Sequence, residues 1–158
     1  MITLRELLPD DSAFMRAMLY EMVFIPENKP PMEEVLSWPG IAHYVCDYGH
    51  AGDFGMLAAV NGEPVGAAWC RLFPISDPGY GFVAEDIPEL SISVDERYRG
   101  RGIGSLLLDA VLERARQSGY RAVSLSVDRA NPAYRLYLSS GFREIPAAGT
   151  SVTMLREF

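Results

Sequence analysis

The sequence predicts a single α/β domain in which a mixed sheet carries helices on both sides. Segments with strand-like and helical patterns alternate along all 158 residues. Asn61-Gly62 separates two apolar segments, which is the strongest short-range signal for a hairpin. Further along, a glycine-rich turn at 99–104 joins an apolar strand to a long amphipathic helix. A chain of this length suits one domain, 1–158.

The first half of the chain predicts a strand, two helices and a hairpin. Apolar residues recur at helical spacing from Phe14 to Met22, after the N-cap candidates Asp11 and Ser12. Prolines at 26, 30 and 31 end that helix. The elements expected are a strand at 3–8, a helix at 11–24, a short helix at 32–37, strands at 54–60 and 65–73, and a long loop at 74–88.

The second half alternates strands and helices. The helix at 102–118 has one apolar face, and Gly119 closes it as a C′ residue. Apolar residues alternate with serines at 122–127, as in a strand packed on one face. The elements expected are strands at 90–94 and 122–127 around that helix, a short helix at 131–139, and a final hairpin of 142–145 and 151–155 joined by 146–149.

The turn at 99–104 is suited to holding phosphate. The first N–H groups of a helix have no partner inside it, and the helix dipole adds positive charge there. Three glycines allow close approach of a ligand and positive φ, while two arginines add charge. The predicted phosphate contacts are Arg99, Gly100, Arg101, Gly102, Ile103, Gly104 and Ser105.

Neither common nucleotide loop fits this turn. Gly104 is followed by Ser105 and Leu106, so the lysine of a P-loop is missing. Ser105 also stands where the third glycine of a dinucleotide-binding fingerprint belongs. The spacing that does fit is Arg-x-x-Gly-x-Gly, from Arg99 to Gly104.

This spacing resembles the coenzyme A pyrophosphate loop of the GNAT superfamily of N-acetyltransferases. A second segment supports the resemblance: residues 131–142, Asn-Pro-Ala-Tyr-Arg-Leu-Tyr-Leu-Ser-Ser-Gly-Phe, are similar to the superfamily's Asn-Pro-Ala-x-x-Leu-Tyr-x-x-x-Gly-Phe. The motifs cover 89–143, and the first 50 residues match by element order alone. The resemblance implies a largely antiparallel mixed sheet of about six or seven strands, about four flanking helices, and acetyl-CoA as cosubstrate.

The resemblance also implies roles for individual residues. Tyr137 matches a tyrosine near the coenzyme sulfur and is the candidate general acid, because a phenol can protonate a departing thiolate. Asn131 matches a residue that binds the pantetheine amides, although capping the short helix explains it equally well, and Tyr134 is included among the cofactor contacts. In the superfamily the strand before the turn splays and offers N–H groups to the pantetheine arm and acetyl oxygen. Ile92 and Val94 are the expected donors, the alternative being a fully paired strand.

Glu89 is the candidate general base, because an amine must lose a proton during acyl transfer. It begins the strand expected to splay and resembles a glutamate used by several family branches, the alternative being an ordinary surface glutamate. A branch acting on protein N-termini carries glutamate within Leu-Glu-Val on the next strand. This chain has Leu125-Ser126-Val127 there, which disfavours that class of acceptor.

Other clusters in the first half point less clearly to function. His43, Cys46, Asp47 and His50 match no zinc spacing, so no metal is expected. Packing is the more common explanation for any single aromatic residue, and exposed loop carboxylates are common. The candidates for lining an acceptor pocket are Trp38, Tyr44, Tyr48, Tyr80 and Phe82, and those for attracting an ammonium group are Asp77, Glu85 and Asp86.

Charge is unevenly distributed along the chain. Residues 1–88 hold 4 basic and 13 acidic side chains, whereas residues 89–158 hold 10 and 8. The basic half suits a polyanionic coenzyme, and the acidic half suits either a cationic amine or simple solubility. The net charge of −7 argues against a nucleic-acid partner. No 18-residue apolar run and no signal-peptide pattern occur. We therefore expect a cytoplasmic protein that does not span a membrane, with Cys46 and Cys70 as thiols unless they form one disulfide.

The function expected is direct transfer of an acetyl group from acetyl-CoA to a primary amine within a ternary complex. Both cysteines lie outside the motifs, so an acetyl-cysteine relay has no support. The alternative is a non-catalytic acyl-CoA sensor on the same fold, which needs residues 99–104 but neither Tyr137 nor a base. A homodimer is left open.

Overall fold

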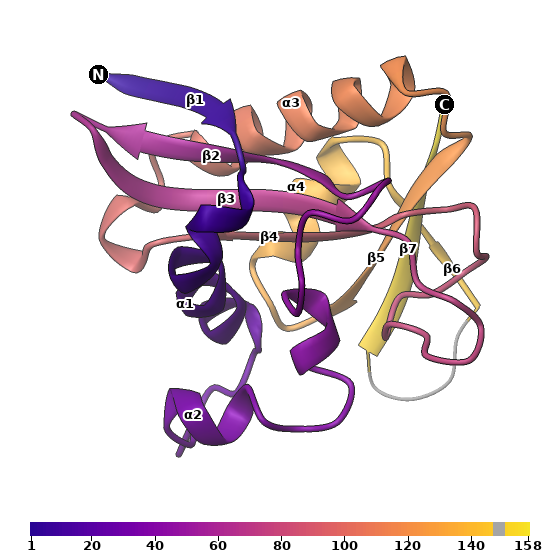
Figure 1. Ribbon diagram of the computed structural model, residues 1–158, viewed down its shortest axis with the longest axis horizontal. Coiled ribbons are helices and arrows are strands. Elements are labelled where there is room, and N and C mark those ends of the chain that lie inside the picture. Colours follow the sequence, from indigo (N-terminus) through magenta and orange to yellow (C-terminus); the bar gives the residue numbers. More distant parts are fainter. Residues whose placement is uncertain (147–150) are drawn as a thin grey trace.

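A computed structural model describes residues 1–146 and 151–158. It confirms the mixed sheet with helices on both sides (Figure 1). The seven strands lie in the order β1-β2-β3-β4-β5-β7-β6, and every neighbouring pair except β4 and β5 is antiparallel. The strands are β1 (Ile2–Glu6), β2 (Phe54–Val60), β3 (Glu63–Arg71), β4 (Glu89–Val94), β5 (Ala122–Asp128), β6 (Arg143–Ile145) and β7 (Ser151–Glu157), and the α-helices are α1 (Ser12–Met22), α2 (Met32–Val35), α3 (Ile103–Gln117) and α4 (Ala133–Ser139).

The hairpin of β2 and β3 turns at Asn61-Gly62 as expected. Both residues have positive φ, 51° and 85°, which is the combination that a type I′ turn requires. One irregularity interrupts the pairing between Ala58 and Ala59. Because that turn sets the register, paired residues of β2 and β3 point to the same face of the sheet.

Several element boundaries differ from the prediction. The first strand stops at Glu6, and a short 3₁₀ helix at Pro9–Asp11 uses proline in its first position. Helix α1 ends at Met22 rather than 24, because Val23 takes an extended backbone with ψ 107°. The pairing of β6 with β7 confirms the final hairpin, while residues 147–150 of its predicted connection lie outside the described residues.

Hydrophobic residues cover both faces of the sheet. In β3, Ala68 and Cys70 contact the apolar cluster under α3 and α4, whereas Ala67 and Trp69 belong to the cluster under α1. Side chains of successive strand residues point to opposite faces, which explains this division. Figure 1 shows α3 on one side of β1–β4 and both α1 and α2 on the other. In the described part of the chain, no helix has the length and hydropathy that crossing a bilayer requires.

The sheet separates between its two parallel strands. Only Glu89 of β4 pairs with Ser124 of β5 in the described structure, and the Ser124 N–H donates to the Pro88 carbonyl at 3.0 Å. Beyond this point β5, β7 and β6 turn away from β1–β4, whose axes stay closely aligned with one another (Figure 1). The separation leaves one edge of β4 facing a gap, and this gap positions the site described next.

Candidate active site

A groove of about 450 Å³ lies where β4 and β5 separate. Its walls come from the end of α1, from β4, from the turn before α3 and the first turn of that helix, from the end of β5, and from the first five residues of α4. Two residues expected to contact the coenzyme, Arg101 and Tyr134, are absent from this lining in the described structure. The groove brings together the other predicted residues: Ile92, Val94, Arg99, Gly100, Gly102, Ile103, Gly104, Ser105, Asn131 and Tyr137.

Alternate backbone amides of β4 point into the groove. The N–H of Asp95 donates to Val65 at the β3 edge at 2.7 Å, and the Pro88 carbonyl faces β5. Since hydrogen-bonding groups alternate between the two sides of a strand, the N–H groups of Ile92 and Val94 face away from β3. They lie on the side where pairing with β5 has ended, so they are available to a ligand.

The turn before α3 opens toward the same groove. Gly100 and Gly102 both have φ of 80°, and a Cβ at either position would meet no atom within 4 Å. Gly104 differs from the expectation of positive φ, because it lies inside α3 with helical backbone. The first intrahelical bond runs from Leu106 N–H to the Gly102 carbonyl, 3.1 Å, so the amides before Leu106 have no partner within the helix. The turn therefore presents N–H groups and open space, as a diphosphate site requires.

Arg99 supplies the positive charge at this end of the groove. Its Nε donates to the Val94 carbonyl at 3.0 Å, and its Nη2 lies 3.9 Å from Glu21 Oε2. Arg101 instead lies over the Tyr98 ring, 5.1 Å from the ring centre. One of the two predicted arginines thus lines the groove.

We expect Gly102→Ala to weaken acetyl-CoA binding about tenfold or more. Alanine at φ of 80° is strained by about 1 kcal/mol and tilts the amides that follow it. Gly119→Ala is the matched control, because Gly119 at the far end of α3 also has positive φ, 87°, and open space around a Cβ. Titration calorimetry with acetyl-CoA should show the loss only for Gly102→Ala. Equal affinities for both variants would contradict a role for this turn in binding.

A second pocket of about 300 Å³ adjoins the groove. We call it the acceptor pocket. The lining residues that the two share come from the end of α1, from β4 and β5 where these strands separate, and from the segment before α4: Met22, Phe24, Leu90, Ser91, Ser126, Val127 and Asn131. Among the aromatic candidates, Trp38, Tyr44 and Tyr80 line the acceptor pocket, whereas Tyr48 and Phe82 belong to the core on the α1 side of the sheet.

Glu89 lies at the junction of sheet and acceptor pocket and is only 3% exposed. The alternative of an ordinary surface glutamate is therefore wrong. The Tyr44 hydroxyl donates to Glu89 Oε2 at 2.5 Å and accepts from the Tyr80 N–H at 2.8 Å. Glu89 Oε1 is buried against the loop at Gly79 and accepts no hydrogen bond of normal geometry from the described residues. Burial raises the pKa of Glu89 to about 7, against the lowering effects of the Tyr44 hydroxyl and the Gly81 backbone N–H.

The loop that follows β3 reaches Glu89 because it contains glycine at 79 and 81. A Cβ on Gly79 would lie 2.1 Å from Glu89 Oε1, and one on Gly81 would lie 2.4 Å from the Leu125 carbonyl carbon. No larger residue fits either position without displacing the carboxylate or the β5 backbone. The Gly-Tyr-Gly sequence was a signal for this close approach that sequence reasoning missed.

Tyr137 and Asn131 come from the second motif and line the groove. Tyr137 is buried, its ring meets Phe142 edge-on at 5.8 Å, and burial raises its pKa above the usual range for a phenol. Asn131 Oδ1 accepts from the Ala133 N–H at 3.0 Å, but the N-cap residue of α4 is Pro132, so the expected capping role of Asn131 is wrong. Since this oxygen is engaged, the NH₂ group of Asn131 is the part left to contact a ligand.

Tyr134 points elsewhere. Its hydroxyl donates to Glu144, which also forms an ion pair with Arg129. These residues lie outside the lining of the groove. The structure therefore separates Tyr134 from the other predicted coenzyme contacts.

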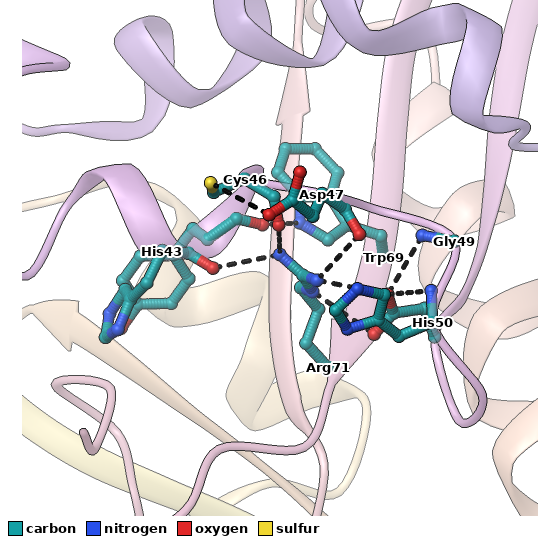
Figure 2. A network of polar contacts seen from close by, with 9 residues as sticks. His43, Cys46, Asp47, Gly49, His50, Trp69 and Arg71 are labelled. Carbon is teal, nitrogen blue, oxygen red and sulfur yellow. Dashed lines mark hydrogen bonds and ion pairs between the residues drawn. The ribbon is translucent and has the colours of Figure 1, made fainter. Parts of the chain in front are cut away.

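The segment 43–50, which contains the histidine and cysteine candidates, contacts Arg71 through its backbone carbonyls. Figure 2 shows the Arg71 guanidinium directed at backbone carbonyls of this segment, with the His43 ring turned away from it. Arg71 donates to the carbonyls of His43 and Cys46 at 3.0 and 2.6 Å and forms an ion pair with Asp53 at 3.1 Å. Nowhere in 1–146 and 151–158 do three His, Cys, Asp or Glu side chains form a group suited to a metal. Cys46 is exposed, Cys70 is buried, and both are free thiols.

We expect Arg71→Met to reduce the free energy of unfolding by about 3 kcal/mol, because it leaves the Asp53 carboxylate buried without its cation. Urea denaturation measures this loss. Arg116→Met is the matched control, since the pair of Arg116 with Glu113 is exposed and should contribute little. Equal losses in both variants would show that Arg71 does not hold the loop.

The loop carboxylates expected to attract an ammonium group have other partners. Asp77 pairs with His43 at 3.1 Å, Asp86 with Arg121 at 2.7 Å, and Glu85 accepts from the Ile75 N–H at 2.8 Å. None of the three lines the acceptor pocket. The carboxylates that line it in the described structure are Glu89, the candidate general base, and Asp128.

Residues 13–142 match the acetyltransferase (GNAT) family. The chain belongs to this family. An uncharacterized N-acetyltransferase of Methanocaldococcus jannaschii is 43% identical over 89 residues, 56% of this chain and 38% of that protein. The matched segment thus spans little more than a third of that relative's length.

Two solved structures share the GNAT fold over nearly the whole chain. PaiA N-acetyltransferase from Thermoplasma acidophilum, in complex with coenzyme A, gives a TM-score of 0.67 at 17% identity, covering 100% of this chain and 99% of that one. A phosphinothricin acetyltransferase from Sinorhizobium meliloti, in complex with acetyl-CoA, gives a TM-score of 0.70 at 21% identity. This match covers 99% of this chain and 88% of that one. At these identities the likeness concerns the fold, and it agrees with the seven-stranded sheet and four helices described above.

Proposed function

We propose that this GNAT domain transfers the acetyl group of acetyl-CoA directly to a primary amine held in the acceptor pocket. The observation that carries the proposal is the position of Glu89. This carboxylate is buried, lines the pocket, and has a pKa raised to about 7 at the place where the pocket joins the groove. A carboxylate with such a pKa is suited to accept protons near neutral pH.

The groove fits acetyl-CoA in two respects. The α3 turn combines free amides, Arg99 and open space over Gly100 and Gly102, which suits the diphosphate. The edge of β4 offers the amides of Ile92 and Val94 to an extended chain with amide groups, such as pantetheine. The bound coenzyme A in PaiA and acetyl-CoA in the phosphinothricin acetyltransferase support this assignment.

In the proposed reaction Glu89 takes one proton from the bound ammonium group, and the neutral nitrogen then forms a bond to the acetyl carbon. The β4 amides stabilise negative charge on the acetyl oxygen. As the carbon–sulfur bond breaks, Tyr137 gives its hydroxyl proton to the thiolate. The surplus proton of the nitrogen restores the Tyr137 hydroxyl through solvent, and Glu89 releases its proton to solvent. The bound thioester supplies the activated acetyl group. Because the pKa of Tyr137 is raised, its hydroxyl carries the proton throughout the neutral range.

The alternative is a sensor that binds an acyl-CoA without turnover. The buried carboxylate and the aromatic pocket beside it favour the enzyme, since a sensor needs neither. Thiol release from acetyl-CoA over a panel of amines, with mass spectrometry of the products, tests the proposal. We expect an acetylated amine; acetyl-CoA binding in calorimetry without turnover of any amine would support the sensor instead.

A further inference from the structure

We infer that the acceptor is a small primary amine with one positive charge, an apolar body of aromatic size and no carboxylate or phosphate. This inference rests on the proposed function and adds the chemical class of the acceptor. The charge, the wall chemistry and the size of the acceptor pocket each restrict the choice.

The charge of the acceptor pocket excludes anionic groups. No Lys, Arg or His occurs in its lining within the described structure, and its charged residues are Glu89 and Asp128. Arg99 lines the groove but not this pocket. A carboxylate on the acceptor would therefore lose its hydration without gaining a cation and would lie near two like charges. Amino acids and phosphorylated amines are unsuitable for the same reason.

Glu89 recognises the amino end of the acceptor. Its side chain lines the pocket while its Oε1 is buried against the loop at Gly79, and no Lys, Arg or His among the described lining residues neutralises the carboxylate. An ammonium group completes the buried pair, and transfer of its proton to Glu89 prepares the nitrogen for reaction. A second ammonium group has a weaker site, because Asp128 is half-buried and its Oδ1 already accepts from the Ala130 N–H at 2.8 Å.

The walls of the pocket favour an apolar and flat body. Aromatic side chains from separate segments line it, at Phe24, Trp38, Tyr44 and Tyr80, together with aliphatic side chains. Tyr80 is 63% exposed and Phe24 37% exposed, so these rings lie at the open side of the pocket. A volume of about 300 Å³ is at the lower end for small-molecule sites and suits one ring with a short chain.

The test compares acceptors that differ in one feature. The probes are 2-phenylethylamine, phenylalanine, 1,4-diaminobutane and a peptide beginning with alanine, each assayed by thiol release with saturating acetyl-CoA. Phenylalanine is 2-phenylethylamine with an added carboxylate, so this pair isolates the charge. We expect kcat/KM for 2-phenylethylamine to exceed that for each other probe at least 100-fold. Preference for phenylalanine, the diamine or the peptide would overturn the inference while leaving acetyl transfer intact.

Trp38→Ala tests the wall of the pocket. We expect the KM for 2-phenylethylamine to rise about tenfold or more while acetyl-CoA affinity, measured by calorimetry, stays unchanged. Phe158→Ala is the control, since Phe158 is 41% exposed and lies outside both pockets. An unchanged KM in Trp38→Ala would contradict an aromatic acceptor. Turnover of no amine at all, with acetyl-CoA bound, would remove the proposed function together with this inference.

Discussion

Replacing Glu89 with Gln is expected to lower kcat/KM for the amine about 10²- to 10⁴-fold, while acetyl-CoA binds as before. The amide keeps the shape of the side chain and can still accept from the Tyr44 hydroxyl, but it cannot take a proton. Thiol-release kinetics give the loss, and calorimetry gives the coenzyme affinity. A variant with wild-type turnover would exclude Glu89 as the base.

The same substitution should change the pH profile. Because burial raises the pKa of Glu89 to about 7, the deprotonated form that accepts a proton accumulates as pH rises. The wild-type kcat/KM is therefore expected to rise with pH and to level off above about 7. In Glu89→Gln this inflection should be absent, and its persistence would assign it to another group.

The contribution of Glu89 to the free energy of unfolding should fall with pH, whereas kcat/KM rises. Glu89 holds its proton to about pH 7 in the folded protein, compared with an ordinary value of 4.5, so the folded state binds more protons between these pH values. The stabilisation that it contributes is complete below the lower pKa and is lost as pH rises through the higher one. Glu89→Gln should therefore be at least as stable as the wild type at pH 8. Lost activity in a fully stable variant separates a chemical role from a structural one.

Replacing Tyr137 with Phe is expected to lower kcat about 10- to 100-fold with little change in acetyl-CoA affinity. The ring contact with Phe142 is kept, so the variant removes the hydroxyl alone. Without it the thiolate leaves unprotonated, which costs a general-acid contribution. The effect should be smaller than for Glu89→Gln, because a thiolate is a tolerable leaving group on its own.

Tyr134→Phe is the matched control for this prediction. Tyr134 lies on the same helix but donates to Glu144, outside the groove. Its hydroxyl should be dispensable for turnover. If Tyr137→Phe retains the wild-type kcat, or if Tyr134→Phe loses as much, Tyr137 is not the acid.

The local parts of this site were predictable from the sequence. Gly102 could be placed because positive φ before a helix is a property of a few adjacent residues, and φ of 80° confirms it. The hairpin at Asn61-Gly62 was predictable for the same reason. Gly104 and Tyr134 show what a motif cannot predict. Gly104 has helical backbone, and the Tyr134 hydroxyl donates to Glu144. Both facts depend on surrounding residues that lie outside the motifs.

Long-range contacts were beyond sequence reasoning. Glu89 was chosen by position in the chain, but its burial depends on Tyr44, 45 residues away, and on the close approach of Gly79. The ion pair of Arg71 with Asp53 joins residues that no local pattern connects. Such contacts form only when the sheet brings separate segments together, and they determine whether a carboxylate is an ordinary surface charge or a base with a pKa near 7.

A crystal structure of the complex with coenzyme A tests the central claim most directly, because it gives the position of the sulfur. We expect the diphosphate on the amides of 102–105 and the sulfur beside the Tyr137 hydroxyl, within about 3.5 Å and open toward the acceptor pocket and Glu89. A diphosphate bound away from the α3 turn, or a sulfur remote from both Tyr137 and Glu89, would contradict the account.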